Sequence, residues 1–261
     1  MSTKVTLVGG PTAVLDLAGL RIITDPTFDP PQVYHHPIAG DVVKTTGPAF
    51  TPEELGRIDI ALASHEHIDN LDMAGREFLH TVPHVFTTTE VADQFGDNVT
   101  GLTEHTSQTV PLPQGGELTI AAVPAKHGPE GTWQALAPVI GFILTGPGVP
   151  RVYVSGDNSQ VEVVSEIAEK YGPIDIAVLF VGGAKFDAIA EGSYITLSNE
   201  RALEAAKILG AKKVIAVHED SWQHFSQNAQ EIRDVFEADG LGDTIIALKP
   251  GESAVVDVSL R

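Results

Sequence analysis

The sequence predicts an α+β fold in which two β-sheets pack face to face with helices on the outside. The first half of the chain is rich in short strand-like segments, and the second half alternates strands and helices. No repeat, charge block or Ser/Gly-rich linker divides the 261 residues, which are enough to bury a large core. Because stacked sheets with outer helices accommodate all these elements, we predict a single domain over residues 1–261.

The N-terminal segment alternates apolar and polar residues as strands do. Three such stretches, Val5–Val8, Ala13–Leu17 and Leu20–Thr24, are separated by short turns that contain glycine. This pattern predicts an antiparallel meander. The stretch Asp25–Pro52 is rich in Pro, Gly and aromatic residues, and we expect a long ordered loop there.

Apolar runs and apolar periodicity define the later elements. Ile58–Ala63 is a short apolar run that predicts a buried strand, and Leu71–Leu79 predicts a helix. Further strands are expected at Val85–Thr88, Leu118–Val123, Val139–Thr145, Val152–Ser155, Ile174–Val181, Val214–Val217, Thr244–Leu248 and Ala254–Val258. Further helices are expected at Glu90–Phe95, Gln160–Tyr171, Asn199–Leu209 and Ala229–Ala238.

Composition and charge exclude several classes of function. With 35 acidic and 16 basic residues the formal charge is −19, and no Lys/Arg run appears, so nucleic-acid binding is not expected. The longest apolar stretch, Ile176–Val181 with its neighbours, is too short to span a bilayer, so membrane insertion is not expected either. The absence of cysteine excludes disulfides, thiolate nucleophiles and Cys-based metal sites. The first residues do not pair a basic segment with a long apolar one. We therefore expect no signal peptide and a cytoplasmic protein.

The residues that indicate chemistry begin with His65, His67 and Asp69, directly after a predicted strand. In extended backbone, residues two apart project to the same side, so these side chains can meet one cation. Imidazole and carboxylate are ligands for zinc, iron or manganese. The alternative interpretation is a polar loop that caps the following helix through Asn70 or Asp72.

Three other predicted strands end in a histidine or an aspartate. These residues are His127, Asp157 and His218. A hydrogen-bonded turn residue explains each of them singly. Four strand ends that terminate in this way, however, are the pattern expected when loops converge on one metal site.

In order and spacing these segments resemble the metallo-β-lactamase-fold hydrolases. Within that group they are most similar to the ascorbate-phosphate lactonase-like and N-acyl-phosphatidylethanolamine phospholipase D-like enzymes. The resemblance extends over nearly the whole chain and implies a four-layer αββα sandwich with metals at one edge of the two sheets. The blocks that carry it are Gly9-Gly10-Pro11-Thr12, Asp25-Pro26, His65-x-His67-x-Asp69, Ser155-Gly156-Asp157 and His218.

The resemblance also implies the residues of the site. The implied ligands are His65, His67 and His127 for one metal and Asp69 and His218 for a second, with Asp157 bridging them. Asp25 would accept a ring N–H from a ligand histidine, with an Asp-Pro turn as the alternative. The chain departs from the family at Asn70, where the family usually has histidine. A carboxamide is a weak, neutral ligand, so this change favours a weaker second metal, a harder one such as manganese, or a single-metal enzyme.

We therefore expect a metal-dependent hydrolase that uses a metal-activated water on a small lactone, ester or phosphodiester. Asp69 would act as general base, and the cofactor would be one or two divalent ions, with zinc favoured over manganese or iron. Lys126, Trp222 and His224 are candidates for a substrate pocket, and His224 is also a candidate replacement for the missing imidazole.

Two other functions compete with this one. The main alternative is a non-catalytic metal- or ligand-binding protein with a degraded second metal site. Redox chemistry at a di-iron centre is less favoured, because nothing resembles an attached flavin-binding module. The expected partner is a small-molecule substrate, and the sequence leaves room for a homo-oligomer.

Overall fold

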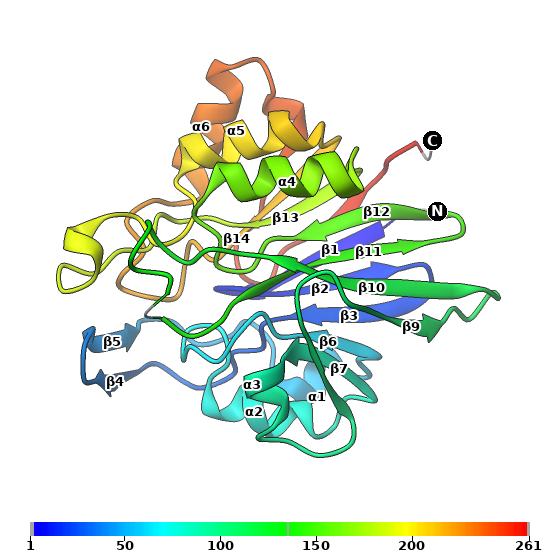
Figure 1. Ribbon diagram of the computed structural model, residues 1–261, viewed down its shortest axis with the longest axis horizontal. Helices are drawn as coiled ribbons and strands as arrows, with labels where there is room; N and C mark the ends of the chain where they lie inside the picture. Colours follow the sequence, from blue (N-terminus) through cyan, green and yellow to red (C-terminus); the bar gives the residue numbers. More distant parts are fainter. Residues whose placement is uncertain (1–2, 135, 260–261) are drawn as a thin grey trace.

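Two seven-stranded sheets pack face to face in the computed structural model, which describes residues 3–134 and 136–259 (Figure 1). Apolar side chains from both inner faces, such as Leu15, Ile60, Phe142 and Val178, form the core between them. Helices cover the outer face of each sheet. The predicted two-sheet sandwich with outer helices is confirmed.

The first sheet joins an antiparallel meander to a parallel part. The meander is confirmed, since β1 pairs with β2 and β2 with β3 in antiparallel register. Beyond β3 the strands pair in parallel. The strands, in spatial order, are β16 (Ser253–Val256), β1 (Thr3–Gly9), β2 (Thr12–Leu17), β3 (Leu20–Thr24), β6 (Ile60–Leu62), β7 (His84–Thr88) and β8 (Val99–Leu102).

The second sheet has the same mixed character. Its parallel strands are covered on both faces, which explains why β13 is apolar and buried at every position. Strands β9 to β12 pair in antiparallel register and β12 to β15 in parallel. The strands, in spatial order, are β15 (Ile245–Ala247), β14 (Lys213–Val217), β13 (Ile176–Phe180), β12 (Val149–Val154), β11 (Ile140–Gly146), β10 (Glu117–Pro124) and β9 (Ser107–Pro111).

Six α-helices formed by the described residues make up the outer layers. Those on the first sheet are α1 (Pro52–Leu55), α2 (Met73–Leu79) and α3 (Thr89–Ala92), and those on the second are α4 (Val161–Tyr171), α5 (Asn199–Leu209) and α6 (Ala229–Ala238). Each longer helix buries one apolar stripe, as α4 does with Val163, Val164 and Ile167. None of the helices formed by the described residues combines the length and hydrophobicity needed to cross a bilayer.

The long loop predicted over residues 25–52 is wrong in part, because a hairpin of β4 (Gln32–His36) and β5 (Gly40–Lys44) lies inside it. Most of its side chains are exposed, so the alternation that marks a half-buried strand is missing. A buried ion pair secures the hairpin instead. The Lys44 ammonium lies 2.8 Å from the Asp72 carboxylate, and both side chains are at most 1% exposed.

Candidate metal centre

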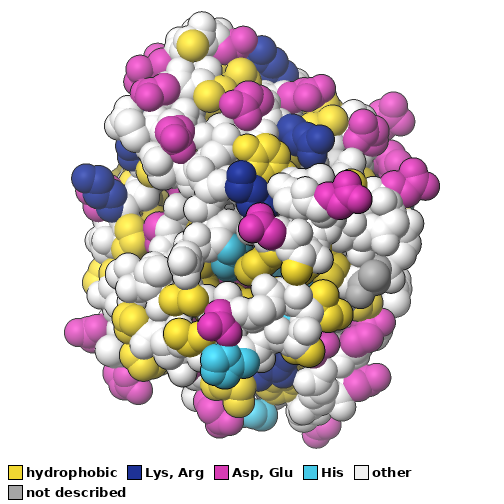
Figure 2. All heavy atoms as spheres, turned by 90° about the vertical axis from the view of Figure 1, so that its left-hand side faces the viewer, with side chains coloured by type: hydrophobic (Ala, Val, Ile, Leu, Met, Phe, Trp, Pro, Cys, Tyr) yellow, Lys and Arg dark blue, Asp and Glu magenta, His cyan; other side chains and the backbone are white. Residues whose placement is uncertain are grey.

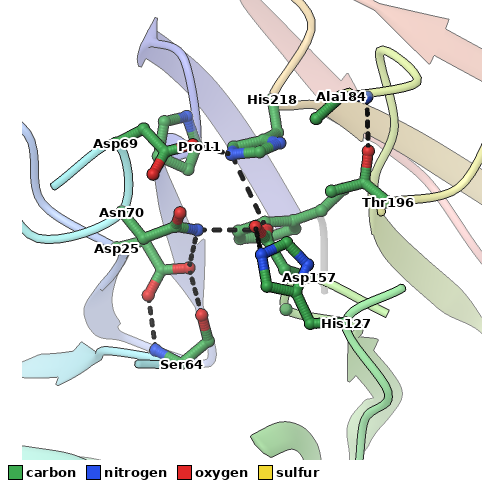
Figure 3. A network of polar contacts seen from close by, with 12 residues as sticks. Pro11, Asp25, Ser64, Asp69, Asn70, His127, Asp157, Ala184, Thr196 and His218 are labelled. Atoms are coloured by element: carbon green, nitrogen blue, oxygen red, sulfur yellow. Dashed lines mark hydrogen bonds and ion pairs between the residues drawn. The ribbon is translucent and has the colours of Figure 1, made fainter. Parts of the chain in front are cut away.

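Loops that follow β6, β10, β12 and β14 bring together the six side chains for which the sequence predicted metal binding. They form two groups, and within each group the candidate ligand atoms lie within 4.8 Å of one another. Figure 3 shows several of these side chains directed toward Asp157 from different loops. The groups are His65, His67 and His127, and Asp69, Asp157 and His218.

The first group consists of three imidazoles that pack at steep angles to one another. The ring centres of His65 and His67 are 4.4 Å apart, and those of His67 and His127 are 5.1 Å apart. Burial, reinforced by the neighbouring imidazoles, lowers the pKa of His65 well below its usual value and that of His67 to about 4. Both rings are therefore neutral at pH 7, which is the form that ligates metals.

The second group combines two carboxylates and one imidazole. The His218 Nε2 atom lies 3.5 Å from Asp69 Oδ2 and 3.6 Å from Asp157 Oδ1. Burial lowers the pKa of His218, but the two carboxylates outweigh it and the net shift is upward. In Asp69, burial acts to raise the pKa, but hydrogen bonds from His218 and His224 prevail and hold it well below its usual value.

Asp157 connects the two groups. Its Oδ2 atom lies 3.6 Å from His127 Nε2 and 3.8 Å from His65 Nε2, while its Oδ1 atom faces His218. Among the described residues, Asp157 Oδ2 and His65 Nε2 are buried without a hydrogen-bond partner. Such orphaned atoms are costly unless an ion or water satisfies them. The donor set therefore fits divalent cations.

Strained backbone supports the site at two of its residues. His218 has φ 66° and Asp25 has φ 29°, in the region that residues other than glycine seldom adopt. Gly156, before Asp157, has φ 56°, and a Cβ atom there would lie 2.8 Å from the Ile140 carbonyl oxygen. Such strain concentrates at functional sites, where the surrounding fold holds it in place.

Asp25 acts on the histidine cluster through Ser64. Its carboxylate accepts hydrogen bonds from the Ser64 backbone N–H and, at 2.8 Å, from the Ser64 hydroxyl. The same hydroxyl lies 2.9 Å from His65 Nδ1, so a serine stands where the sequence predicted a direct contact between Asp25 and an imidazole. Burial raises the pKa of Asp25 to about 7. The sequence interpretation missed Ser64, whose only signal was its position beside His65.

Asn70 occupies the centre of the network between the carboxylates (Figure 3). Its amide donates a hydrogen bond of 3.1 Å to Asp157 Oδ1 and one of 3.3 Å to Asp25 Oδ2. The helix cap that the sequence offered as an alternative role belongs to Asp72, which accepts from the Gly75 N–H. By donating to both, the Asn70 amide reduces the repulsion between the Asp25 and Asp157 carboxylates.

The three side chains predicted for a substrate pocket lie around the cluster in different ways. His224 Nε2 is 2.9 Å from Asp69 Oδ2. The Trp222 ring packs against Tyr34, with ring centres 5.8 Å apart, and the Lys126 ammonium lies 5.1 Å from the Trp133 ring centre. A cavity of about 410 Å³ opens onto His67, Asp69 and His127, and its lining, within the described ranges, includes none of the three.

Comparison with known proteins agrees with this fold and identifies the family of the chain. The family model for a beta-lactamase superfamily domain matches residues 20–218. A UPF0173 metal-dependent hydrolase of Methanoculleus marisnigri is 30% identical over 76% of this chain and 82% of its own length. One from Pyrococcus furiosus is 26% identical over 77% of this chain and 83% of its own. The chain thus belongs to the UPF0173 metal-dependent hydrolases of the beta-lactamase superfamily.

Solved structures share the whole architecture. The isothiocyanate hydrolase from Delia radicum gut bacteria superposes with a TM-score of 0.80 at 22% identity, over 96% of this chain and 98% of that one. The metallo hydrolase Igni18 of Ignicoccus hospitalis gives a TM-score of 0.74, also at 22% identity, over 99% of this chain and 100% of its own. At this level of identity the likeness concerns the fold.

Proposed function

We propose that this chain hydrolyses a small lactone, ester or phosphodiester at the candidate metal centre. The observation that carries the proposal is the pair of buried ligand groups, joined through Asp157, at the bottom of an open cavity. A site of this kind offers a protected place for a reacting bond beside strongly polarising groups. The proposed ligands are His65, His67 and His127 for one cation, Asp69 and His218 for a second, and Asp157 for both.

The protein side chains orient the reacting groups. A divalent cation at such a site supplies a Lewis acid and lowers the pKa of bound water. Asp69 is held ionised by its hydrogen bonds, so it is able to accept the proton of the attacking water as general base. His127 Nδ1 donates to the Ile195 carbonyl oxygen at 2.7 Å, which leaves Nε2 free for a cation.

The resemblance to the ascorbate-phosphate lactonase-like and phospholipase D-like branch adds phosphorylated lactones and phosphodiesters to the candidate substrates, beside neutral lactones and esters. Zinc as the preferred metal, with manganese or iron as alternatives, remains a prediction from the sequence, as do a single domain, a cytoplasmic location and self-association. The competing proposal is a metal- or ligand-binding protein without turnover. Asn70 motivates it, because this amide supplies the second site with no imidazole.

The test is turnover by metal-loaded protein on a panel of lactones, aryl esters and bis-aryl phosphodiesters. Isothiocyanates complete the panel, because one protein of similar fold is named an isothiocyanate hydrolase. We expect hydrolysis of at least one class, lost in His65→Ala together with bound metal. His84→Ala, which removes an exposed histidine of β7, is the matched control. Equal rates in wild type and His65→Ala would refute the proposal, and bound metal without any turnover would favour the binding protein.

A further inference from the structure

The cavity over the candidate metal centre is built from four separate parts of the chain. These are the β4–β5 hairpin, the loop after β6, the β10–β11 loop that contains His127 and Leu136, and the segment after β13 that contains Phe186. Figure 2 looks onto this end of the molecule, where histidine side chains lie in a recess bordered by hydrophobic ones. At about 410 Å³ the cavity is large enough for a small organic molecule.

The lining is mainly apolar. Of the fourteen described residues that line it, nine are aliphatic or aromatic, among them Ile38, Leu136, Phe186 and Ile189. Three of the other five belong to the proposed ligand set. The remaining two are His36 and Glu66, and the Glu66 carboxylate accepts a 2.8 Å hydrogen bond from Gln94 and pairs with Arg76 at 3.5 Å. Glu66 is thus already satisfied by neighbours outside the cavity.

No lysine or arginine lines the cavity within the part of the chain that the structure describes. The two lysines nearest in sequence to the site are held by aromatic rings. The Lys126 ammonium lies 5.1 Å from the Trp133 ring centre, and that of Lys185 lies 5.6 Å from the Tyr194 ring centre. The formal charge of −19 adds a long-range field that repels anions. In the apolar part of the cavity, away from the proposed cations, an anionic substituent would therefore lose its hydration without gaining a counter-charge from a lysine or arginine.

We propose that the cavity selects uncharged substrates that carry an apolar group next to the reacting bond. This inference rests on the proposed hydrolase function and narrows it. It favours neutral esters, lactones and related electrophiles over substrates with a carboxylate, sulfonate or phosphate substituent. The apolar group would lie between the hairpin residue Ile38 and the side chains of Leu136, Phe186 and Ile189.

Three acetyl esters that differ in one substituent test the proposal. They are phenyl acetate, 4-ethylphenyl acetate and 4-acetoxybenzenesulfonate, and kcat/KM is measured with the metal-loaded protein by following release of the phenol. We expect kcat/KM to rise about tenfold with the two added carbons and to fall at least about 100-fold with the sulfonate. Because the sulfonate also improves the leaving group, intrinsic reactivity acts against the expected order.

Two lysine variants on the same hairpin, one inside and one outside the cavity lining, form a matched test and control. Ile38 lines the cavity and is 65% exposed, while Val33 is 47% exposed and lies outside the lining, so both positions tolerate a long polar side chain. Ile38→Lys should reduce the ratio of kcat/KM for phenyl acetate to kcat/KM for the sulfonate by about fivefold, because the new ammonium would form an exposed ion pair with the sulfonate. Val33→Lys should leave it unchanged. Equal turnover of both esters by the wild type, or equal effects of the two variants, would overturn the proposal.

A binding measurement separates this proposal from the hydrolase function. Saturation-transfer NMR with the metal-loaded protein compares phenol with 4-hydroxybenzenesulfonate, the products of the matched pair. Preferential binding of phenol supports the uncharged apolar selectivity even if no ester is turned over, in which case only the hydrolase proposal fails. Equal or stronger binding of the sulfonate overturns the selectivity.

Discussion

The buried ion pair between Lys44 and Asp72 provides a quantitative test of how the β4–β5 hairpin is held. The Asp72 carboxylate accepts the Lys44 ammonium at 2.8 Å and the backbone N–H groups of Phe28, Asp29 and Gly75 at 2.7–2.9 Å. One carboxylate therefore joins the hairpin, the segment after β3 and the start of α2. We expect Lys44→Met, which keeps the length of the side chain and removes its charge, to destabilise the protein severely.

The magnitude follows from burial. Because the two side chains are 1% and 0% exposed, the variant leaves a carboxylate buried without its cation. Removing one partner of such a pair costs about 3–5 kcal/mol in the free energy of unfolding. For a chain of this size that corresponds to a melting temperature lower by roughly 6–20 °C.

Urea denaturation followed by circular dichroism and tryptophan fluorescence measures the effect. Lys4→Met, on the exposed side of β1, is the matched control and should change the free energy of unfolding by less than about 0.5 kcal/mol. A loss below about 1 kcal/mol in Lys44→Met is the value of a solvated surface pair and would refute the reasoning.

Three further predictions concern a helix glycine, a buried carboxyl group and the serine beside His65. Gly75→Ala should destabilise α2 by about 1–3 kcal/mol in urea denaturation, although alanine favours helices, since its Cβ would lie 1.8 Å from the Pro26 carbonyl oxygen; increased stability would contradict this. Burial, aided by the Asp220 carboxylate, raises the pKa of Glu219 from 4.5 to about 8. The native state then keeps a proton that the unfolded chain releases, so the unfolding free energy of metal-free wild type should fall with rising pH across that window. Glu219→Gln should lose the part of this slope that Glu219 contributes and keep the part due to Asp25, whose pKa is also raised, and parallel curves would speak against it. Ser64→Ala should weaken zinc binding about 10- to 100-fold in chelator competition, whereas unchanged affinity would exclude a positioning role.

Local chemistry explains which elements were predictable. Helices α5 and α6 begin and end at the predicted residues, because Ser198 and Asn228 cap their first turns with side-chain hydrogen bonds. Strand β13 was recognisable as an unbroken apolar run. The hairpin β4–β5 was not, because its stability depends on contacts made by Lys44 with residues distant in sequence. Strands β8 and β9 were also missed, since most of their side chains are only partly buried or exposed.

In the candidate site, too, the features set by local sequence were predictable and those set by distant contacts were not. The spacing of His65, His67 and Asp69 is a local property of extended backbone, and the sequence alone could predict that these side chains share one side. The hydrogen bonds by which Ser64 connects Asp25 to His65 depend on tertiary structure. They form only because strands β3 and β6 of the first sheet lie side by side. The hydrogen bond from His224 to Asp69 likewise joins residues 155 positions apart.

The sequence by itself determined the class of fold, the most regular elements and the set of side chains offered to a metal, because periodicity, capping and ligand spacing act over a few residues. The tertiary structure decided what surrounds that set. Lys126 was a candidate for the substrate pocket, and the fold directs its ammonium onto the Trp133 ring instead. The mainly apolar lining of the cavity arises from four distant segments, and only their packing determines which side chains face a substrate.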